Sequence, residues 1–282
     1  MMDKTDIDKF LKNMKGMKQD KQRVNVIYLT TACNLRCTYC YEQNSRGQQK
    51  KLLPVHIDQF LDEIMAREAG MVSTVVIMGG EPFLAYPLLC YALKKMCEAD
   101  HNWGVTITTN GTVTQEYYSV MQWYNHHDNL SFTVEVSYDV TGQDSRIYHN
   151  GISSRKKVES FLNELLIAGV PFAISYTIHK GNYKNLLKDM VLLCEKYNPT
   201  KISLSPFCSE LDKLTGDYKK FMSDFIPYAE YITEKYKIPI CDSSCRVCGK
   251  CDKSSFIGNA YMSPTTGLTY QDQSTEKKFD KF

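Results

Sequence analysis

The sequence predicts an α/β fold whose strand–helix alternation fits an open sheet or a full or partial barrel. The expected architecture is a partial (β/α)6 TIM-like barrel that ends in a small cysteine-rich hairpin extension. Two observations support this prediction. Strand-like and helix-like segments alternate through most of the 282 residues. The strand-like runs are apolar over nearly their whole length, which is typical of a parallel sheet buried on both faces. Ligands of such folds bind at the carboxyl ends of the strands, so the loops after the strands are the candidate functional segments.

Each strand is expected where β-branched and apolar residues cluster between polar or turn-forming residues. The six strands of the barrel are expected at residues 24–30, 72–78, 104–109, 130–139, 170–178 and 201–207. Helices are expected where apolar residues recur at three- and four-residue spacing, at 54–67, 86–98, 115–124, 152–168, 182–197 and 217–235. Gly169 stands just past the fourth helix, a position that glycine favours. A final hairpin is expected over 256–270, with Gly267 in its turn region.

These elements divide the chain into four expected segments. A charged N-terminal segment covers residues 1–22, the barrel 23–208, a linking helix 209–240, and the extension with a polar tail 241–282. The length fits one large domain with a small appendage.

Composition and charge limit the classes of function. The 34 Lys and Arg residues nearly balance the 32 Asp and Glu residues, for a net charge of +2, so no basic field recruits nucleic acid or an anionic membrane. Residues 1–22 lack the apolar run of a signal peptide, and no stretch of about 18 apolar residues occurs. We therefore expect a cytoplasmic protein. Because disulfides are rare in that reducing compartment, clusters among the 11 cysteines indicate metal binding or catalysis.

The first cysteine cluster lies in the loop directly after the first expected strand. Cys33, Cys37 and Cys40 have the spacing C-x3-C-x2-C. Soft thiolates favour an iron–sulfur cluster or zinc. A four-iron cluster takes four ligands, so three cysteines would leave one iron open to another molecule.

This cysteine run, with aromatic Tyr39 before the last cysteine, resembles the signature of the radical S-adenosylmethionine (radical SAM) superfamily. The resemblance extends from the first strand to the hairpin, and its other motifs follow the second, third and fourth strands. They are Gly79-Gly80-Glu81-Pro82, similar to the GGEP motif, Thr109-Asn110-Gly111-Thr112, similar to the TNG motif, and Ser137-Tyr138-Asp139, similar to a serine–aspartate pair of the peptide-modifying subgroup.

The resemblance implies an oxidoreductase or maturase-type enzyme. A [4Fe-4S] cluster on the three cysteines would bind the amino and carboxylate groups of S-adenosylmethionine at its open iron. Reductive cleavage would give methionine and a 5′-deoxyadenosyl radical, which would abstract hydrogen from a substrate. The protein would bind, orient and exclude water.

The resemblance also implies a set of cofactor-binding residues. Tyr39, Thr109 and Asn110 belong to this set, and the resemblance gives them no more specific role. Gly79 and Gly80 would let the backbone approach the ligand, and Pro82 would set the turn. The Glu81 carboxylate would pair with the ligand ammonium group, the alternative being a solvated loop charge.

The fourth strand and its following loop would contact the other end of the ligand. Ser137 and Asp139 would hydrogen-bond the ribose or the methionyl group, and Arg146 would meet the methionyl carboxylate. Here the sequence departs from the subgroup, whose pair is followed by Gly and then His-Asp, because residues 140–146 read VTGQDSR. A surface position is therefore the alternative for Arg146. Ile178 stands where the family contacts adenine, with a core position as its alternative.

The second cysteine cluster lies after the barrel. Cys241, Cys245, Cys248 and Cys251 supply four thiols in the pattern C-x3-C-x2-C-x2-C. Their place before a hairpin resembles the SPASM or twitch extensions, which carry auxiliary four-iron clusters. No cysteine follows the hairpin, so a shortened extension with one auxiliary [4Fe-4S] cluster is expected. Structural zinc and free thiols are the alternatives, and Cys208 is a possible replacement ligand.

The expected substrate is a peptide or protein side chain, and the expected electron donor is a flavodoxin or ferredoxin. The alternatives are the same radical chemistry on a small molecule or nucleoside, and a non-catalytic iron–sulfur or zinc protein. No leader-binding domain is evident before residue 23. Four residues near strand ends are candidates for facing the expected reaction chamber, although none is assigned as an acid or base: Tyr176, His179, Ser205 and Cys208. For His179 a surface or hydrogen-bonded structural position is the alternative.

Overall fold

The computed structural model describes residues 24–40, 49–124, 127–242, 258–263 and 267–272. Its centre is a nine-stranded sheet with the order β7-β6-β5-β4-β3-β2-β1-β8-β9. The strands are β1 (Val24–Tyr28), β2 (Val72–Met78), β3 (Asn102–Thr109), β4 (Leu130–Ser137), β5 (Phe172–Ile178), β6 (Ile202–Pro206), β7 (Ile240–Asp242), β8 (Gly258–Ser263) and β9 (Gly267–Asp272). Neighbouring strands are parallel throughout, except for the antiparallel pair β8–β9.

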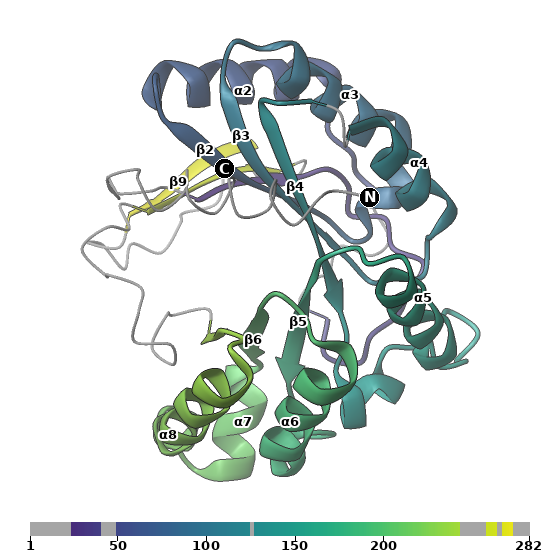
Figure 1. Cartoon of the computed structure of the whole chain (residues 1–282), viewed down its shortest axis with the longest axis vertical. Helices are drawn as coiled ribbons and strands as arrows, with labels where there is room; N and C mark the ends of the chain where they lie inside the picture. Colours follow the sequence, from purple (N-terminus) through teal and green to yellow (C-terminus); the bar gives the residue numbers. More distant parts are fainter. Residues whose placement is uncertain (1–23, 41–48, 125–126, 243–257, 264–266, 273–282) are drawn as a thin grey trace.

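Helices connect the parallel strands and lie along one face of the sheet. They are α2 (Pro54–Arg67), α3 (Tyr86–Glu98), α4 (Gln115–Tyr124), α5 (Arg155–Ile167), α6 (Leu186–Tyr197), α7 (Cys208–Thr215) and α8 (Tyr218–Tyr236). Short 3-10 turns follow three strands, at η2 (Pro82–Ala85), η3 (Val140–Ser145) and η4 (Tyr183–Asn185). Figure 1 shows that the sheet curves, with the helices along its outer side. This curled α/β half-barrel confirms the expected fold class.

The two faces of the sheet differ in chemistry. On β2 and β3 every second residue is buried, and these residues, such as Ile77 and Ile107, pack against the helices. The alternate residues, such as Thr106 and Thr108, are half-buried on the inner face of the curve. Helices therefore cover one face of these strands, and the inner face is more polar on β3 to β6. The expectation of strands that are apolar on both faces is wrong for this part of the sheet.

The structure adds one β/α step to the six that the sequence predicts. The expected linking helix corresponds to α8, which leads into β7, and β7 pairs with β6 in parallel. Asp217 caps this helix by accepting hydrogen bonds from the Lys219 and Lys220 amides at 2.9 and 3.1 Å. The three-residue strand β7 was too short to give a periodic signal, and so was α7.

The expected hairpin is confirmed, although it is not a separate layer. β8 pairs with β1 in parallel, at the opposite edge of the sheet from β7. Gly267 begins β9 opposite Ser263, in the residue pair that directly flanks the expected turn. The expected helix 152–168 begins only at Arg155, because Ile147 and Ser153 form an antiparallel bridge before it. Within the described part of the chain, no helix combines the length and apolarity that a membrane span requires.

Candidate functional site

The cysteine loop after β1 is fixed to the ends of neighbouring elements by backbone hydrogen bonds. The Gly80 amide donates to the Thr30 carbonyl at 2.7 Å, and the Glu81 amide donates to the Ala32 carbonyl at 2.8 Å. On its other side, the Thr38 amide donates to the Ser145 carbonyl at 3.0 Å. The loop therefore lies at the carboxyl edge of the sheet, where the fold predicts a ligand site.

The three thiols of this loop lie close enough to interact electrostatically. Burial raises the pKa of the Cys33 thiol to about 12, and the charges of Glu81, Cys37 and Cys40 add to this effect, against a hydrogen bond from the Leu35 amide. A thiol in this environment becomes a thiolate only when a cation compensates it, as a bound metal centre does. Three soft donors from one loop fit an iron–sulfur cluster. Among the described residues, no group of three or more His, Cys, Asp and Glu side chains has an arrangement that would hold a single metal ion.

Gly79 and Gly80 pack against the backbone of the cysteine loop. A Cβ atom on Gly80 would lie 2.3 Å from the Ala32 carbonyl oxygen, and one on Gly79 would lie 2.6 Å from the Thr30 carbonyl oxygen. Such distances are far below van der Waals contact, and the obstructing atoms are backbone. The absent side chains therefore allow the turn after β2 to pack directly on the cysteine loop, and the expected close approach of this backbone to a ligand stays a prediction.

Glu81 is fully buried, which excludes the alternative of a solvated loop charge. Its carboxylate accepts hydrogen bonds from the Phe83 amide at 3.2 Å, the Thr109 hydroxyl at 2.9 Å and the Asn110 amide at 2.8 Å. Burial raises the pKa of this carboxyl to about 7, although the three donors oppose the shift. Pro82 occupies the first position of η2, as its expected role in the turn requires.

Asn110 joins the third strand to the cysteine loop. Its side-chain amide donates to the Asn34 side-chain oxygen at 2.9 Å and lies 3.8 Å from the Cys33 sulfur. The Thr112 amide and hydroxyl both donate to the Asn110 side-chain oxygen, which fixes the orientation of the amide group. Sequence reasoning missed Asn34, because only the folded loop brings it opposite Asn110.

Asp139 is the centre of a buried ion pair. It accepts hydrogen bonds from the Arg146 guanidinium at 2.8 and 3.3 Å, and from the Thr177 amide at 2.8 Å. The Tyr39 hydroxyl donates to the same carboxylate, and the Arg146 guanidinium lies 5.4 Å from the Tyr39 ring centre. Arg146 is 8% exposed, so it is not the surface arginine of the alternative. The structure thus brings together three predicted site residues, Tyr39, Asp139 and Arg146. The arginine forms its ion pair with Asp139 and is shielded from solvent.

A histidine that the sequence did not assign completes this cluster. The His179 ring lies 4.4 Å from the Tyr39 ring, and its Nε2 atom is 3.9 Å from the Asp139 carboxylate. Cβ atoms on Gly142 and Gly181 would lie 2.4 and 2.8 Å from the ring, so both glycines are needed to enclose it. Burial lowers the pKa of His179.

The remaining predicted residues lie in different surroundings. Ser137 is 9% exposed on the inner face, close to the motifs above. Ile178 is fully buried in the hydrophobic core, which is the position that its alternative describes. Tyr176 is buried on the helix-covered face and donates to Asp189 at 2.6 Å, so it does not face the chamber as expected. Ser205 is exposed near the end of β6.

Only one member of the second cysteine cluster is described. Cys241 is half-buried in β7, in register with Ser203 of β6. Cys245, Cys248 and Cys251 lie outside the described residues, and so does the side chain of Cys208.

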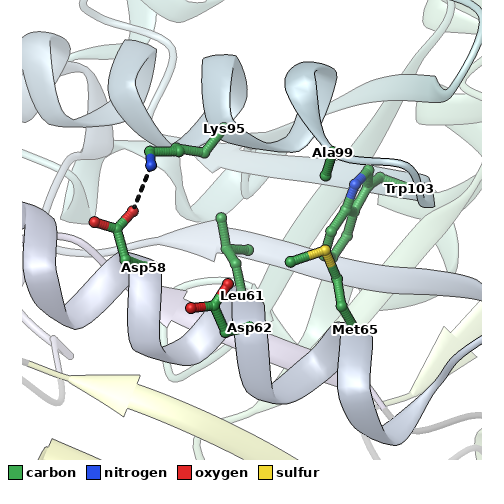
Figure 2. A pocket seen from close by; sticks show the side chains of 7 residues that line it. All are labelled: Asp58, Leu61, Asp62, Met65, Lys95, Ala99 and Trp103. Atoms are coloured by element: carbon green, nitrogen blue, oxygen red, sulfur yellow. Dashed lines mark ion pairs between the residues drawn. The ribbon is translucent and has the colours of Figure 1, made fainter.

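A surface pocket of about 240 Å³ lies away from this site, between α2, α3 and the start of β3. It is lined by Asp58, Leu61, Asp62, Met65, Lys95, Ala99 and Trp103 (Figure 2). An ion pair of 3.3 Å between Lys95 and Asp58 spans one end of it. None of the motif residues lines this pocket, which lies on the helical side of the sheet.

Comparisons with known proteins extend these observations. A model of the radical SAM superfamily matches residues 27–194, more than half of the chain. A structure of anSMEcpe with bound AdoMet is similar with a TM-score of 0.59 at 19% identity, over 78% of this chain and 63% of that one. The structure of Streptococcus suis SuiB bound to the precursor peptide SuiA gives a TM-score of 0.61 at 16% identity, over 97% of this chain and 67% of that one.

A curated relative shares a shorter segment. The GTP 3′,8-cyclase of Chlorobaculum tepidum is 38% identical over 90 residues, which are 31% of this chain and 25% of the cyclase. The chain therefore spans a quarter of the cyclase and less than two thirds of anSMEcpe. At their low identities the solved structures show a shared fold alone. The family match covers the cysteine loop and the three motifs built around it, and the chain belongs to the radical SAM superfamily.

Proposed function

We propose that this chain cleaves S-adenosylmethionine reductively and directs the resulting radical at a peptide or protein side chain. The superfamily uses a [4Fe-4S] cluster and AdoMet, which when bound supply one electron and a 5′-deoxyadenosyl radical that abstracts hydrogen. The observation that carries the proposal is the buried hydrogen-bond network of Glu81. This carboxylate ties the end of β2 to the end of β3, directly beside the cysteine loop.

The residues of the site have separable roles in this proposal. Cys33, Cys37 and Cys40 hold the cluster. Glu81 receives the ligand ammonium group, since a carboxylate that accepts three hydrogen bonds retains acceptor capacity for a charged donor. The Asp139–Arg146 pair holds the Tyr39 ring beside Cys40 and thus orients the loop.

A peptide substrate is favoured by the structural similarity to SuiB, which binds the precursor peptide SuiA in its solved complex. The second candidate is a nucleotide substrate, which the partial similarity to GTP 3′,8-cyclase favours. A triphosphate is best bound by Arg and Lys side chains. Strands β1 to β6 carry neither residue type, and the buried Arg146 is already paired with Asp139, so these residues give a triphosphate no free cationic partner, which favours the peptide candidate.

We further propose that Cys241, Cys245, Cys248 and Cys251 hold one auxiliary [4Fe-4S] cluster in a shortened SPASM-like or twitch-like extension. The half-buried place of Cys241 at the sheet edge supports this, because it puts the first ligand next to the barrel. A flavodoxin or ferredoxin would supply electrons, and the protein would act in the cytoplasm.

Metal analysis and product analysis test these proposals separately. Anaerobically reconstituted protein is expected to hold about eight iron atoms per chain and no zinc, and a Cys245→Ala variant about four. With reductant and S-adenosylmethionine the protein should release 5′-deoxyadenosine, and mass spectrometry of added peptide pools should find a modified peptide. Stimulation of that release by GTP and not by peptides would favour the nucleotide candidate.

A further inference from the structure

The inner face of the barrel contains a single charged side chain on its first six strands. Strands β1 to β6 include no Lys, Arg, His or Asp, and Glu135 of β4 is their one acidic residue. Its neighbours Val134 and Val136 are buried, and Val136 lies with Phe161 of α5 on the helix-covered face. Because side chains alternate along a strand, Glu135 faces the inner side of the curve, where it is half-buried.

Contacts with the neighbouring strand orient this carboxylate. Thr108 is the register partner of Glu135 on β3, and its hydroxyl donates to Oε2 at 3.1 Å. Ser137 follows two residues later on the same face, roughly 7 Å along the strand towards the carboxyl edge. Glu135 thus lies on the inner face of the curved sheet, two residues before Ser137 of the proposed cofactor site.

The inner face around Glu135 carries hydroxyl groups along its own strand and becomes apolar further across the sheet. Thr133 and Ser137 on β4 share its face, Ala173 is its register partner on β5, and Ser175 pairs with Ser137. On the other side, beyond Thr108 of β3, lie Met78 of β2, one residue past the Ile77–Ile107 register pair, and Tyr28 of β1, the register partner of Met78. An elongated group with an apolar stem and a polar end matches this change across the sheet.

Among the described residues no cationic side chain forms an ion pair with Glu135. A half-buried carboxylate with one hydroxyl donor keeps most of its acceptor capacity unused. Burying it further, as substrate binding would, is unfavourable unless a cation or several donors compensate it. The substrate group that binds beside Glu135 is therefore expected to carry a positive charge.

We infer that Glu135 selects a basic side chain, lysine or arginine, of the peptide substrate. The ammonium or guanidinium group would bind the carboxylate, and the aliphatic stem would lie along Met78 and Tyr28. This inference rests on the proposed peptide-modifying function and specifies its substrate class. The same charge repels a nucleoside triphosphate.

The test measures binding, so that it does not depend on turnover. Reconstituted enzyme with S-adenosylmethionine and without reductant is mixed with a peptide library randomised at five positions, and the bound fraction is sequenced by mass spectrometry. Lysine and arginine should be enriched roughly fivefold to tenfold at one position, which corresponds to a partly desolvated charge pair. Glu135→Gln should abolish this enrichment, and Glu135→Lys should replace it by enrichment of Asp and Glu.

The matched control is Glu98→Gln, which removes an exposed carboxylate of the outer helix α3 and should leave the enrichment unchanged. Equal enrichment of basic residues in the wild type and the Glu135→Gln variant would overturn the inference, as would no basic enrichment in the wild type. Release of 5′-deoxyadenosine by the reduced wild-type enzyme is scored separately. If the wild type releases 5′-deoxyadenosine but shows no basic enrichment, or shows the same enrichment as Glu135→Gln, the role of Glu135 alone is refuted. Absence of the release would refute the proposed function.

Discussion

Asp139→Asn should destabilise the protein far more than an ordinary loss of charge. The carboxylate is fully buried and accepts hydrogen bonds from Tyr39, Arg146 and the Thr177 amide. The substitution leaves the buried Arg146 guanidinium without a counter-ion, and breaking such a pair from one side costs about 3–5 kcal/mol. For a domain of this size the loss corresponds to a fall of roughly 6–20 °C in the melting temperature.

The assay is thermal and urea unfolding of the metal-free protein, followed by circular dichroism. The matched control is Asp144→Asn, which removes the same group from an exposed ion pair with Arg155 at 3.0 Å and should cost about 0–1 kcal/mol. The double variant Asp139→Asn/Arg146→Met should be less destabilised than the sum of its single variants, because no charge is left unpaired. Equal losses for Asp139→Asn and Asp144→Asn would refute the interpretation of Asp139 as the centre of the cluster.

Three further predictions concern single positions. Gly80→Ala should abolish iron incorporation, because its Cβ would lie 2.3 Å from the Ala32 carbonyl, whereas Gly104→Ala, with its nearest contact at 3.6 Å, should bind iron normally by metal analysis. Since the folded pKa of Glu81 is raised to about 7, the native state binds the extra proton, and this contribution to stability is present below the unfolded pKa and lost as pH rises to about 7. The unfolding free energy of the metal-free wild type relative to Glu81→Gln should therefore fall over that pH window, and a constant difference in urea titrations would contradict it. Val140 has a left-handed φ of 47°, so Val140→Gly should be no less stable than Val140→Ala in thermal unfolding, the reverse of the usual order.

The sequence was sufficient for the parts of the fold that depend on local pattern. The strand at 72–78 and the helices at 54–67, 86–98 and 115–124 are observed with the expected bounds, because the apolar run of the strand and the apolar periodicity of the helices are complete. The motifs after β1 to β4 were expected at one edge of the sheet, since parallel strands end on the same side. Their proximity therefore required no knowledge of the tertiary contacts.

Long-range contacts account for what the sequence did not predict. The need for glycine at position 80 comes from the cysteine loop, nearly 50 positions earlier in the chain. The pairing of Arg146 with Asp139 depends on η3, which begins at Val140 in a backbone conformation that is rare for a β-branched residue. The enclosed position of the His179 ring requires glycine at positions 142 and 181, which lie in separate turns. Motifs mark Gly80 and Asp139 in the sequence, but they do not reveal which residues these positions contact in the folded chain.

The central claim, that the cysteine loop supports reductive cleavage of S-adenosylmethionine, is tested most directly by product analysis. The anaerobically reconstituted protein is mixed with dithionite and S-adenosylmethionine, and 5′-deoxyadenosine is quantified by chromatography and mass spectrometry. The account predicts that the wild type forms 5′-deoxyadenosine and that Cys37→Ala, which removes one proposed cluster ligand, forms none. Formation of no more product by the wild type than by the variant, with the wild-type cluster intact by absorbance and iron analysis, would contradict it.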